Sequence, residues 1–160
     1  MTLEQKTAAL LAQCRLQGEK ISVAESCTGG MLAALLTSIA GSSDVFDCGF
    51  VTYSNEAKKR MLGVPHDLIA EYGAVSRECS LSMAHGAILG SAATLAVSIT
   101  GVAGPGGGTA AKPVGLVHIA CARRNGTTQH REMRFGDIGR SAVRLASVEV
   151  ALELLEAQVL

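Results

Sequence analysis

The chain has 160 residues, of which 48% are hydrophobic and 18% charged, a length and an apolar content that predict one folded domain and exclude intrinsic disorder. Its 14 basic residues balance its 14 acidic ones, so it lacks the broad positive field of a protein that binds nucleic acid or anionic membranes. Aromatic residues make up only 3% and tryptophan is absent, which argues against a surface that stacks nucleobases.

The first third of the chain predicts helices that alternate with short strands. Apolar positions at helical spacing indicate a helix over residues 3–17, and the β-leaning run 21–24 predicts a short strand after it. Beyond a polar segment that ends in two glycines, leucine and alanine predict a helix over residues 31–39. The β-branched and aromatic run 45–53 then predicts a second strand.

The middle of the chain predicts two helices and the strand that is best suited to burial. The helices are expected over residues 55–62 and 77–89, the second with Ser76 as its N-cap. Between them, residues 65–71 predict a helical turn with proline at its first position. Residues 94–100 predict a buried strand that runs directly into a glycine-rich segment.

The last third of the chain predicts a hairpin followed by a long helix. The β-leaning runs 114–122 and 127–135 flank an Asn-Gly dipeptide at 125–126, which is a strong hairpin signal. Apolar residues that recur every three or four positions predict a helix from Ile138 to the end, with Asp137 as its N-cap. The whole pattern predicts an α/β domain with a mixed sheet that helices cover on both faces.

The cysteines and histidines indicate neither disulfide bonds nor a metal site. The five cysteines are widely spaced without a Cys-x-x-Cys pair, and the four histidines lack metal-ligand spacing. The N-terminal segment indicates an amphipathic helix rather than a signal peptide, and no uninterrupted apolar stretch is long enough to span a membrane. We therefore expect one cytoplasmic domain over residues 1–160, whose apolar composition favours a homo-oligomer.

Residues 25–30, Glu-Ser-Cys-Thr-Gly-Gly, lie where a strand is expected to pass into a helix. Free backbone N–H groups at a helix start suit an anion or an oxyanion, and Ser26 stands just upstream, where a nucleophile is needed. Cys27 is the minor alternative, because no histidine is placed nearby to activate its thiol. From these residues alone a structural interpretation stays equally open, with a capping hydroxyl and glycines that form a tight turn.

Residues 100–109 form a glycine-rich segment directly after the buried strand. Five glycines occupy residues 101–108, yet the pattern matches neither G-x-G-x-x-G nor the Walker A motif. Glycine lets the backbone approach a ligand closely and lets consecutive N–H groups form an anion-binding nest. Because so much glycine costs chain entropy, a ligand-binding loop is favoured over a simple connector.

Tyr53 and Lys58 stand at the end of a predicted strand and one turn into the next helix. Either side chain can accept a proton from a serine only if its pKa is depressed by burial or by a neighbouring cation. The local sequence by itself favours an ordinary surface helix here.

Arg140 and Arg144 lie four residues apart near the start of the last predicted helix. Positive charge at that end opposes the helix dipole, so stability alone does not favour the arrangement. A bound anion and a salt bridge to a distant carboxylate are equally good explanations.

Together these motifs resemble the CinA C-terminal domain family. The resemblance covers essentially the whole chain and rests on residues 25–30, 51–55, 73–76, 100–108 and 112–115. The family has a three-layer α/β/α sandwich fold, and its members of known activity are nicotinamide-nucleotide amidohydrolases, so the resemblance implies both for this chain. The chain has no room for the larger N-terminal module of full-length CinA proteins, so the stand-alone form is expected.

The resemblance also implies roles for individual residues. Ser26 would attack the carboxamide carbon of nicotinamide mononucleotide, with Tyr53 and Lys58 as its activating partners. N–H groups around residues 28–30 would hold the oxyanion, and the scheme needs no metal and no cofactor. Substrate binding is expected from Thr28, Gly29, Gly30, Thr100, Gly101, Gly104, Gly106 and Arg140. The alternative is a non-catalytic nucleotide-binding module, linked to competence or the DNA-damage response, that uses the same loops.

Overall fold

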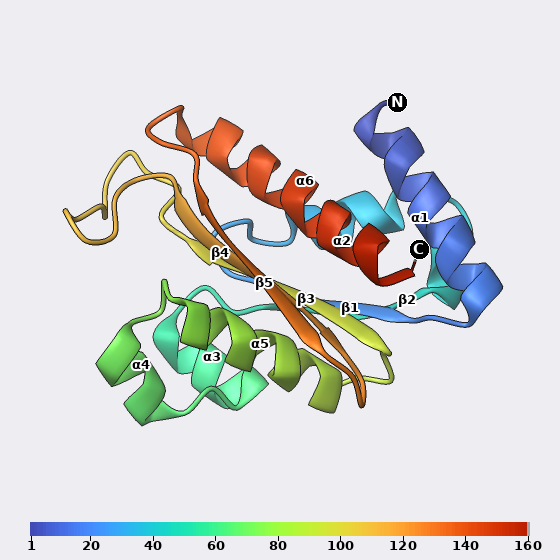
Figure 1. Cartoon of the computed structure of the whole chain (residues 1–160), viewed down its shortest axis with the longest axis horizontal. Helices are drawn as coiled ribbons and strands as arrows, with labels where there is room; N and C mark the ends of the chain where they lie inside the picture. Colours follow the sequence, from blue (N-terminus) through green and yellow to red (C-terminus); the bar gives the residue numbers. More distant parts are fainter. Residues whose placement is uncertain (160) are drawn as a thin grey trace.

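A five-stranded mixed sheet forms the middle layer of the fold (Figure 1). The structure, a computed structural model, describes residues 1–159. The strands are β1 (Ile21–Glu25), β2 (Phe46–Val51), β3 (Leu95–Gly101), β4 (Leu116–Arg123) and β5 (Thr128–Arg134). Their order is β2-β1-β3-β4-β5, with β1 parallel to both of its neighbours and β4 antiparallel to both of its own.

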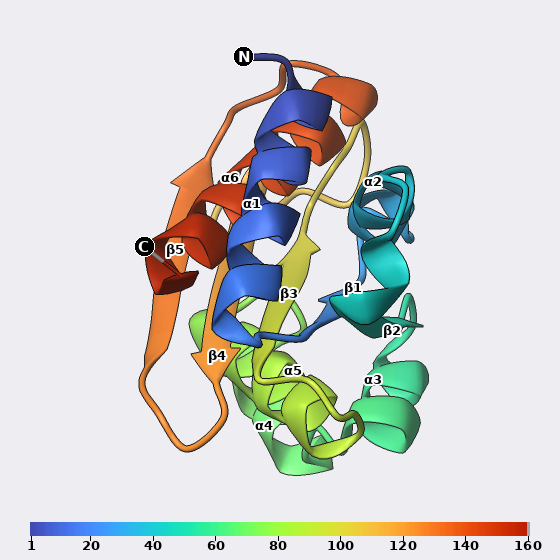
Figure 2. The ribbon, with the colours of Figure 1, turned by 90° about the vertical axis from the view of Figure 1, so that its right-hand side faces the viewer.

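Helices cover both faces of this sheet. They are α1 (Leu3–Gln17), α2 (Met31–Thr37), α3 (Asn55–Leu62), α4 (His66–Tyr72), α5 (Arg77–Leu89) and α6 (Arg140–Val159), with a short 3₁₀ turn over Ser42–Asp44. Figures 1 and 2 show α1, α2 and α6 on one face and α3, α4 and α5 on the other. The predicted three-layer α/β/α sandwich is confirmed. No helix within residues 1–159 combines the length and apolarity needed to span a membrane.

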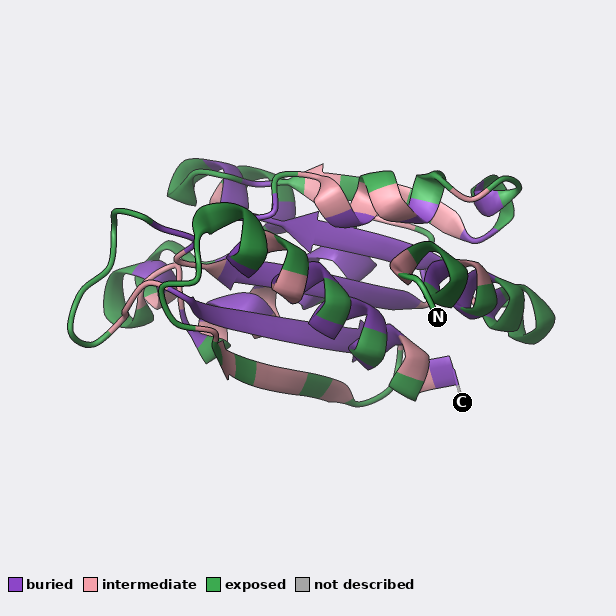
Figure 3. Ribbon diagram, turned by 90° about the horizontal axis from the view of Figure 1, so that it is seen from above, coloured by how far each residue is buried: buried purple, intermediate pink, exposed green. Residues whose placement is uncertain are grey.

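The two faces of the sheet bury different kinds of side chain. Toward α1, α2 and α6 the core consists mainly of leucine, isoleucine and valine, whereas toward α5 alanines are prominent on both the strands and the helix. Strands β1, β3 and β4 are buried along almost their whole length, while the edge strands β2 and β5 alternate between partly buried and exposed residues (Figure 3). At Gly86 of α5, an added Cβ would lie 2.0 Å from the Leu62 carbonyl oxygen, so α3 and α5 pack in close contact.

Several predicted elements begin and end as the sequence indicates. The helices over residues 55–62 and 77–89 are confirmed, and the Ser76 hydroxyl caps the second by accepting the Cys79 N–H at 3.1 Å. The hairpin between β4 and β5 is also confirmed. Its turn holds Asn125 at a φ of +58°, in the left-handed region that asparagine tolerates better than most residues.

The start of the last helix is corrected by the structure. We expected it at Ile138 with Asp137 as the N-cap, but α6 begins at Arg140. The Gly139 carbonyl accepts the Val143 N–H at 3.0 Å, so Gly139 holds the N-cap position. Glycine accounts for the shift, because Gly139 has a φ of +102° and interrupts the helical conformation between the predicted start and the observed one.

Helix α2 and strand β2 are also shorter than expected. Helix α2 ends at Thr37 instead of residue 39, where the hydroxyls of Thr37 and Ser38 donate back to helix carbonyls and compete with the regular pattern. The strand predicted over residues 45–53 ends at Val51. A separate difference concerns α4: Pro65 takes its N-cap position and not its first helical position. The chain after Val51 therefore leaves the sheet early and turns across its carboxyl end into α3.

Candidate active site

A cavity of about 320 Å³ lies at the carboxyl ends of the parallel strands β1 and β3. Ligands commonly bind at this end of an open α/β sheet. In Figure 1 it is the end from which the long segment between β3 and β4 extends. Among the described residues that line it, none is acidic. The predicted site residues on its wall are Ser26, Tyr53, Lys58, Thr100, Gly101, Gly104, Gly106 and Arg140.

Ser26 and Lys58 meet inside this cavity. The Nζ atom of Lys58 lies 3.0 Å from Ser26 Oγ and 2.9 Å from the Thr52 carbonyl oxygen, to which it donates. Ser26 is fixed at the end of β1 because its N–H donates to the Ile99 carbonyl of β3 at 2.9 Å. Only 8% of Ser26 and 2% of Lys58 is exposed. The sandwich thus buries a hydroxyl beside an amine from a residue 32 positions later in the chain.

The environment of Lys58 destabilises its charged form relative to water. Burial lowers the pKa of the Lys58 ammonium, because the charged form loses its hydration in the protein interior. The nearby Cys79 and Cys27 raise this pKa, but less strongly. Within residues 1–159 Lys58 forms no ion pair with a carboxylate. A neutral amine can donate to the Thr52 carbonyl and still accept the proton of Ser26.

Cys27 lines the same cavity, but its thiol is held in the protonated form. Burial raises the pKa of Cys27 to about 11, although the positive charges of Arg144 and Arg140 lower it. Because the thiolate is the reactive species, a buried thiol of this kind is a poor nucleophile at neutral pH. The electrostatics therefore favour Ser26 over the minor candidate.

The start of α2 is occupied by a side chain of the protein itself. The buried Glu25 carboxylate accepts the N–H groups of Leu32 and Ala33 at 3.0 Å each and the Thr28 hydroxyl at 2.6 Å. The Gly29 N–H donates to the Ser26 carbonyl at 3.0 Å. These donors are therefore not free for a ligand.

Three predicted binding residues lie off the wall of the cavity. Thr28, Gly29 and Gly30 are not among the residues that line it, and the Thr28 side chain is fully buried. In this segment, the N–H groups of Cys27, Thr28 and Gly30 are the ones without an acceptor among the described residues. Any oxyanion contact from this loop has to come from these backbone groups and not from the start of α2.

The glycine-rich segment offers backbone donors to the cavity. Within the described part of the chain, no acceptor is found for the N–H groups of residues 103, 104 and 106–108. Val102 anchors its beginning by donating to the Leu116 carbonyl at 2.9 Å. Gly104 has a φ of +82°, and a Cβ there would lie 2.5 Å from Val114 Cγ1. Neighbouring free N–H groups of this kind suit an anionic group on a ligand.

Tyr53 pairs with Arg140 and not with Ser26. The Tyr53 side chain is 61% exposed, and its hydroxyl accepts a hydrogen bond of 2.8 Å from Arg140 Nη2. Arg140 Nη1 donates to the Gly104 carbonyl, also at 2.8 Å. The structure therefore brings Lys58, but not Tyr53, within hydrogen-bond distance of Ser26, and it places a guanidinium on the wall of the cavity.

Sequence reasoning missed the partners of Arg144. Its Nε and Nη2 atoms donate to the carbonyl oxygens of Cys27 and Thr28, at 3.0 Å each. The spacing of Arg140 and Arg144 was informative, but it indicated an anion or a carboxylate. Carbonyl partners leave no sequence signal, because every residue carries one.

Other residues of the wall were also missed. Asn55, Ala74 and Val75 line the cavity, and the Thr100 hydroxyl donates to the Ala74 carbonyl at 2.9 Å. Their segments were among the motifs of the resemblance, which was the available signal. Within residues 1–159, no group of three or more histidine, cysteine, aspartate or glutamate side chains is arranged to hold a metal ion.

Comparisons with known proteins agree on one family. The CinA C-terminal domain matches residues 3–159. A CinA-like protein of Geobacter sp. (strain M21) is 48% identical over 158 residues, covering 99% of this chain but 37% of the relative. The chain thus spans about a third of the length of the curated relatives it matches.

Solved structures share the whole fold, as the following examples illustrate. The crystal structure of the competence/damage inducible protein CihA from Agrobacterium tumefaciens has 54% sequence identity and a TM-score of 0.95, covering 98% of each chain. A competence-damaged protein (CinA) superfamily protein from Klebsiella pneumoniae has 34% identity and a TM-score of 0.93, covering 99% of this chain and 98% of its own.

Proposed function

Because the chain belongs to the CinA C-terminal domain family, we propose that it hydrolyses the carboxamide of nicotinamide mononucleotide to nicotinate mononucleotide and ammonia. The observation that carries this proposal is the contact of 3.0 Å between Ser26 Oγ and a buried lysine amine that has no carboxylate partner among the described residues. A pocket that only bound a nucleotide would have no need of this pair. The arrangement has the two components of a serine amidohydrolase that uses lysine as its base.

Acylation begins with neutral Lys58. Its amine takes the proton of Ser26 Oγ while the oxygen attacks the carboxamide carbon of the substrate. The resulting tetrahedral oxyanion is stabilised by free backbone N–H groups next to Ser26. The Lys58 ammonium then gives its proton to the amide nitrogen. The C–N bond breaks, ammonia leaves, and the acyl group remains as an ester on Ser26.

Deacylation uses the same base a second time. Neutral Lys58 takes a proton from a water molecule, whose oxygen attacks the ester carbon. The second tetrahedral intermediate collapses, the proton returns from Lys58 to Ser26 Oγ, and nicotinate mononucleotide is released. Throughout the cycle the Thr52 carbonyl accepts an N–H of Lys58 and keeps the amine aimed at Ser26.

The charge of the cavity supports a substrate that carries a phosphate. Arg140 is the first residue of α6, so its guanidinium and the positive end of the helix dipole lie at the same wall. Free N–H groups of residues 103, 104 and 106–108 add further donors. We propose that these groups bind the 5′-phosphate and that Tyr53 positions Arg140 through their hydrogen bond, leaving Lys58 as the base.

An ammonia-release assay with purified protein tests the proposal. Nicotinamide mononucleotide, nicotinamide and glutamine are compared as substrates, and only the mononucleotide is expected to be hydrolysed efficiently. The ratio kcat/KM should increase with pH as neutral Lys58 becomes more populated, and level off above its lowered pKa. Binding of the mononucleotide without ammonia release would favour the alternative, a non-catalytic nucleotide-binding module.

A further inference from the structure

The two arginines at the start of α6 contact different parts of the site. Arg140 lines the cavity, whereas Arg144, one turn later, does not. Arg144 instead donates from Nε to the Cys27 carbonyl and from Nη2 to the Thr28 carbonyl. A single planar guanidinium therefore holds two successive carbonyls of the loop that follows Ser26.

These contacts determine how the peptide groups after Ser26 are oriented. In a trans peptide the N–H points away from the C=O of the same peptide group. Because the Cys27 carbonyl faces Arg144, the Thr28 N–H points away from Arg144. The Ser26 carbonyl is taken by the Gly29 N–H, which fixes the Cys27 N–H in the same way. Among the described residues neither the Cys27 nor the Thr28 N–H has an acceptor.

The loop is also held by a second charged side chain. The Thr28 hydroxyl donates to the buried Glu25 carboxylate at 2.6 Å, and the same carboxylate binds the first turn of α2. The positive charge of Arg144 on two carbonyls polarises their peptide groups, and polarised groups are stronger N–H donors. Arg144 thus acts on the peptide backbone beside the nucleophile without facing the cavity itself.

We propose that Arg144 is a positioning residue for amide hydrolysis. Its hydrogen bond to the Thr28 carbonyl polarises the Gly29 N–H, which in turn donates to the Ser26 carbonyl and so polarises the free N–H of Cys27. Cys27 lines the cavity, and its N–H stabilises the oxyanion formed when Ser26 attacks the carboxamide. This inference rests on the proposed function and assigns its oxyanion donor to one backbone group, the N–H of Cys27. It separates the two arginines by role, since Arg140 is expected to act on substrate binding and Arg144 on the chemical step.

Variants of the two arginines test this separation. Arg144→Met keeps much of the side-chain volume but removes both hydrogen bonds, and it should lower kcat for ammonia release by about 10-fold to 100-fold. The KM for nicotinamide mononucleotide should stay within about twofold. Arg144→Lys keeps the charge but not the paired donors, so its kcat should lie between those of Arg144→Met and the wild type. Arg140→Met, the matched control, should mainly raise KM.

A probe that does not resemble the nucleotide gives a second readout. An alkyl fluorophosphonate reacts with an activated serine through a negatively charged intermediate, so its rate of labelling Ser26 should fall in parallel with kcat in the Arg144 variants. Ser26→Ala is the negative control, because it lacks the hydroxyl that the probe labels. Thermal melting of the same proteins measures the structural effect of each change, which should not follow the order of the labelling rates.

Each outcome has a defined meaning. If the wild type is labelled by the probe but releases no ammonia from the mononucleotide, the proposed function fails, while the labelling rates still decide the role of Arg144. Arg144→Met with wild-type kcat and labelling rate would overturn the inference, as would a rise in KM alone. If Arg144→Met does not fold, Arg144→Lys carries the test. A wild-type Ser26 that the probe does not label also overturns it.

Discussion

The two loops that form the cavity are stabilised in opposite ways. The loop after β1 (residues 26–30) is mostly buried and is held by two charged side chains, Glu25 at the end of β1 and Arg144 from α6. The loop after β3 (residues 102–108) is exposed over residues 105–108 and consists mainly of glycine. Several of its backbone N–H groups have no acceptor among the described residues. Yet both loops follow parallel strands that lie side by side.

This difference indicates a division of labour. A nucleophile and its oxyanion donors have to be fixed before the substrate arrives, because reorganisation during the reaction would raise the barrier. A loop that binds a phosphate group instead needs free N–H donors and a backbone that the ligand can approach closely. Changes in the first loop should therefore affect kcat and stability, and changes around the second should affect KM.

Removal of the nucleophile should give the largest effect. Ser26→Ala should lower kcat for ammonia release from nicotinamide mononucleotide at least about 10³-fold, because burial raises the pKa of Cys27, the other candidate nucleophile in the cavity, to about 11. The melting temperature should change little, since only one small hydroxyl is lost. Parallel ammonia assays and thermal melts check both points. A variant that retained wild-type activity would show that the nucleophile is another group.

The next largest effect is expected when the side chain that holds the first loop is changed. This change should lower the stability of the protein. Glu25→Gln replaces a carboxylate that accepts three donors, so it should lower the free energy of unfolding by about 2 kcal/mol. Gly106→Ala in the second loop should change it by less than about 0.5 kcal/mol, because a Cβ there meets nothing within 4 Å. Urea unfolding measures both, and equal losses would remove the contrast between the loops.

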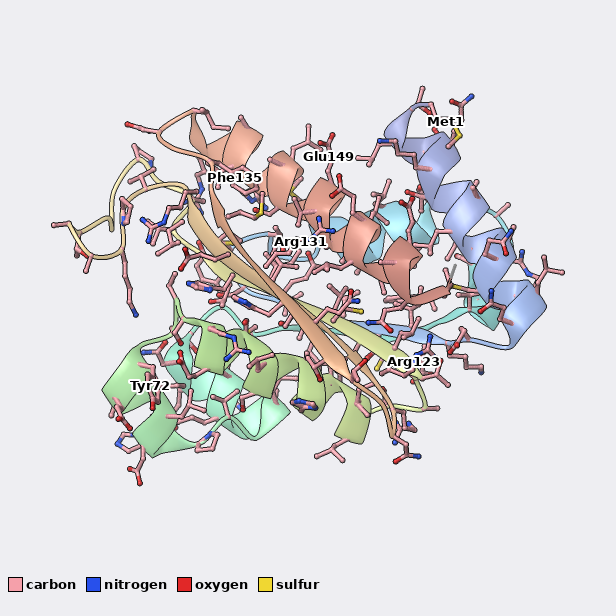
Figure 4. The ribbon with its side chains drawn as sticks, in the orientation of Figure 1. Met1, Tyr72, Arg123, Arg131, Phe135 and Glu149 are labelled. Carbon is pink, nitrogen blue, oxygen red and sulfur yellow. The ribbon has the colours of Figure 1, made fainter. Side chains whose placement is uncertain are left out.

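A change in the residues expected to bind the substrate phosphate should have a smaller effect. Arg140→Ala should raise KM for the mononucleotide about tenfold, equivalent to about 1.4 kcal/mol, with a smaller change in kcat. Arg131→Ala is the control for charge: this residue lies on β5 (Figure 4), away from the cavity, and pairs with Glu153 at 2.7 Å. Steady-state kinetics of the two variants should differ, and an unchanged KM in Arg140→Ala would exclude it from the phosphate site.

The smallest expected effect is a change in pH dependence caused by buried Lys58. Its pKa is lowered in the folded state, so between the folded and unfolded pKa values the unfolded chain binds more protons. Wild-type stability should therefore increase with pH through that window, by at most about 1.4 kcal/mol per pH unit. Lys58→Met lacks this dependence.

The stability of Lys58→Met relative to the wild type should accordingly increase as the pH falls. Urea unfolding of both proteins across a range of pH measures the difference. A difference that stayed constant with pH would mean that burial does not lower the Lys58 pKa and would weaken its assignment as the base.

Local sequence determined most of the secondary structure of this protein. Helical periodicity, the Ser76 cap and the Asn-Gly turn depend on interactions between near neighbours, so they can be inferred from a short stretch of chain. Helix α6 shows where such inference stops. Its apolar pattern extends to Ile138, but the backbone conformation of Gly139 delays the start of the helix, and a pattern of hydrophobicity does not report φ.

The arrangement of side chains in the site depends on the tertiary structure. Ser26 and the glycine-rich segment were recognisable as motifs, but the local sequence favoured a surface position for Lys58, and only packing of α3 beneath the sheet buries its amine beside Ser26. The sequence likewise shows the charge of Arg144, but it does not show which two carbonyl groups the side chain binds. Proton affinity and hydrogen-bond partners depend on burial and on distances between residues far apart in the chain, and folding alone sets both.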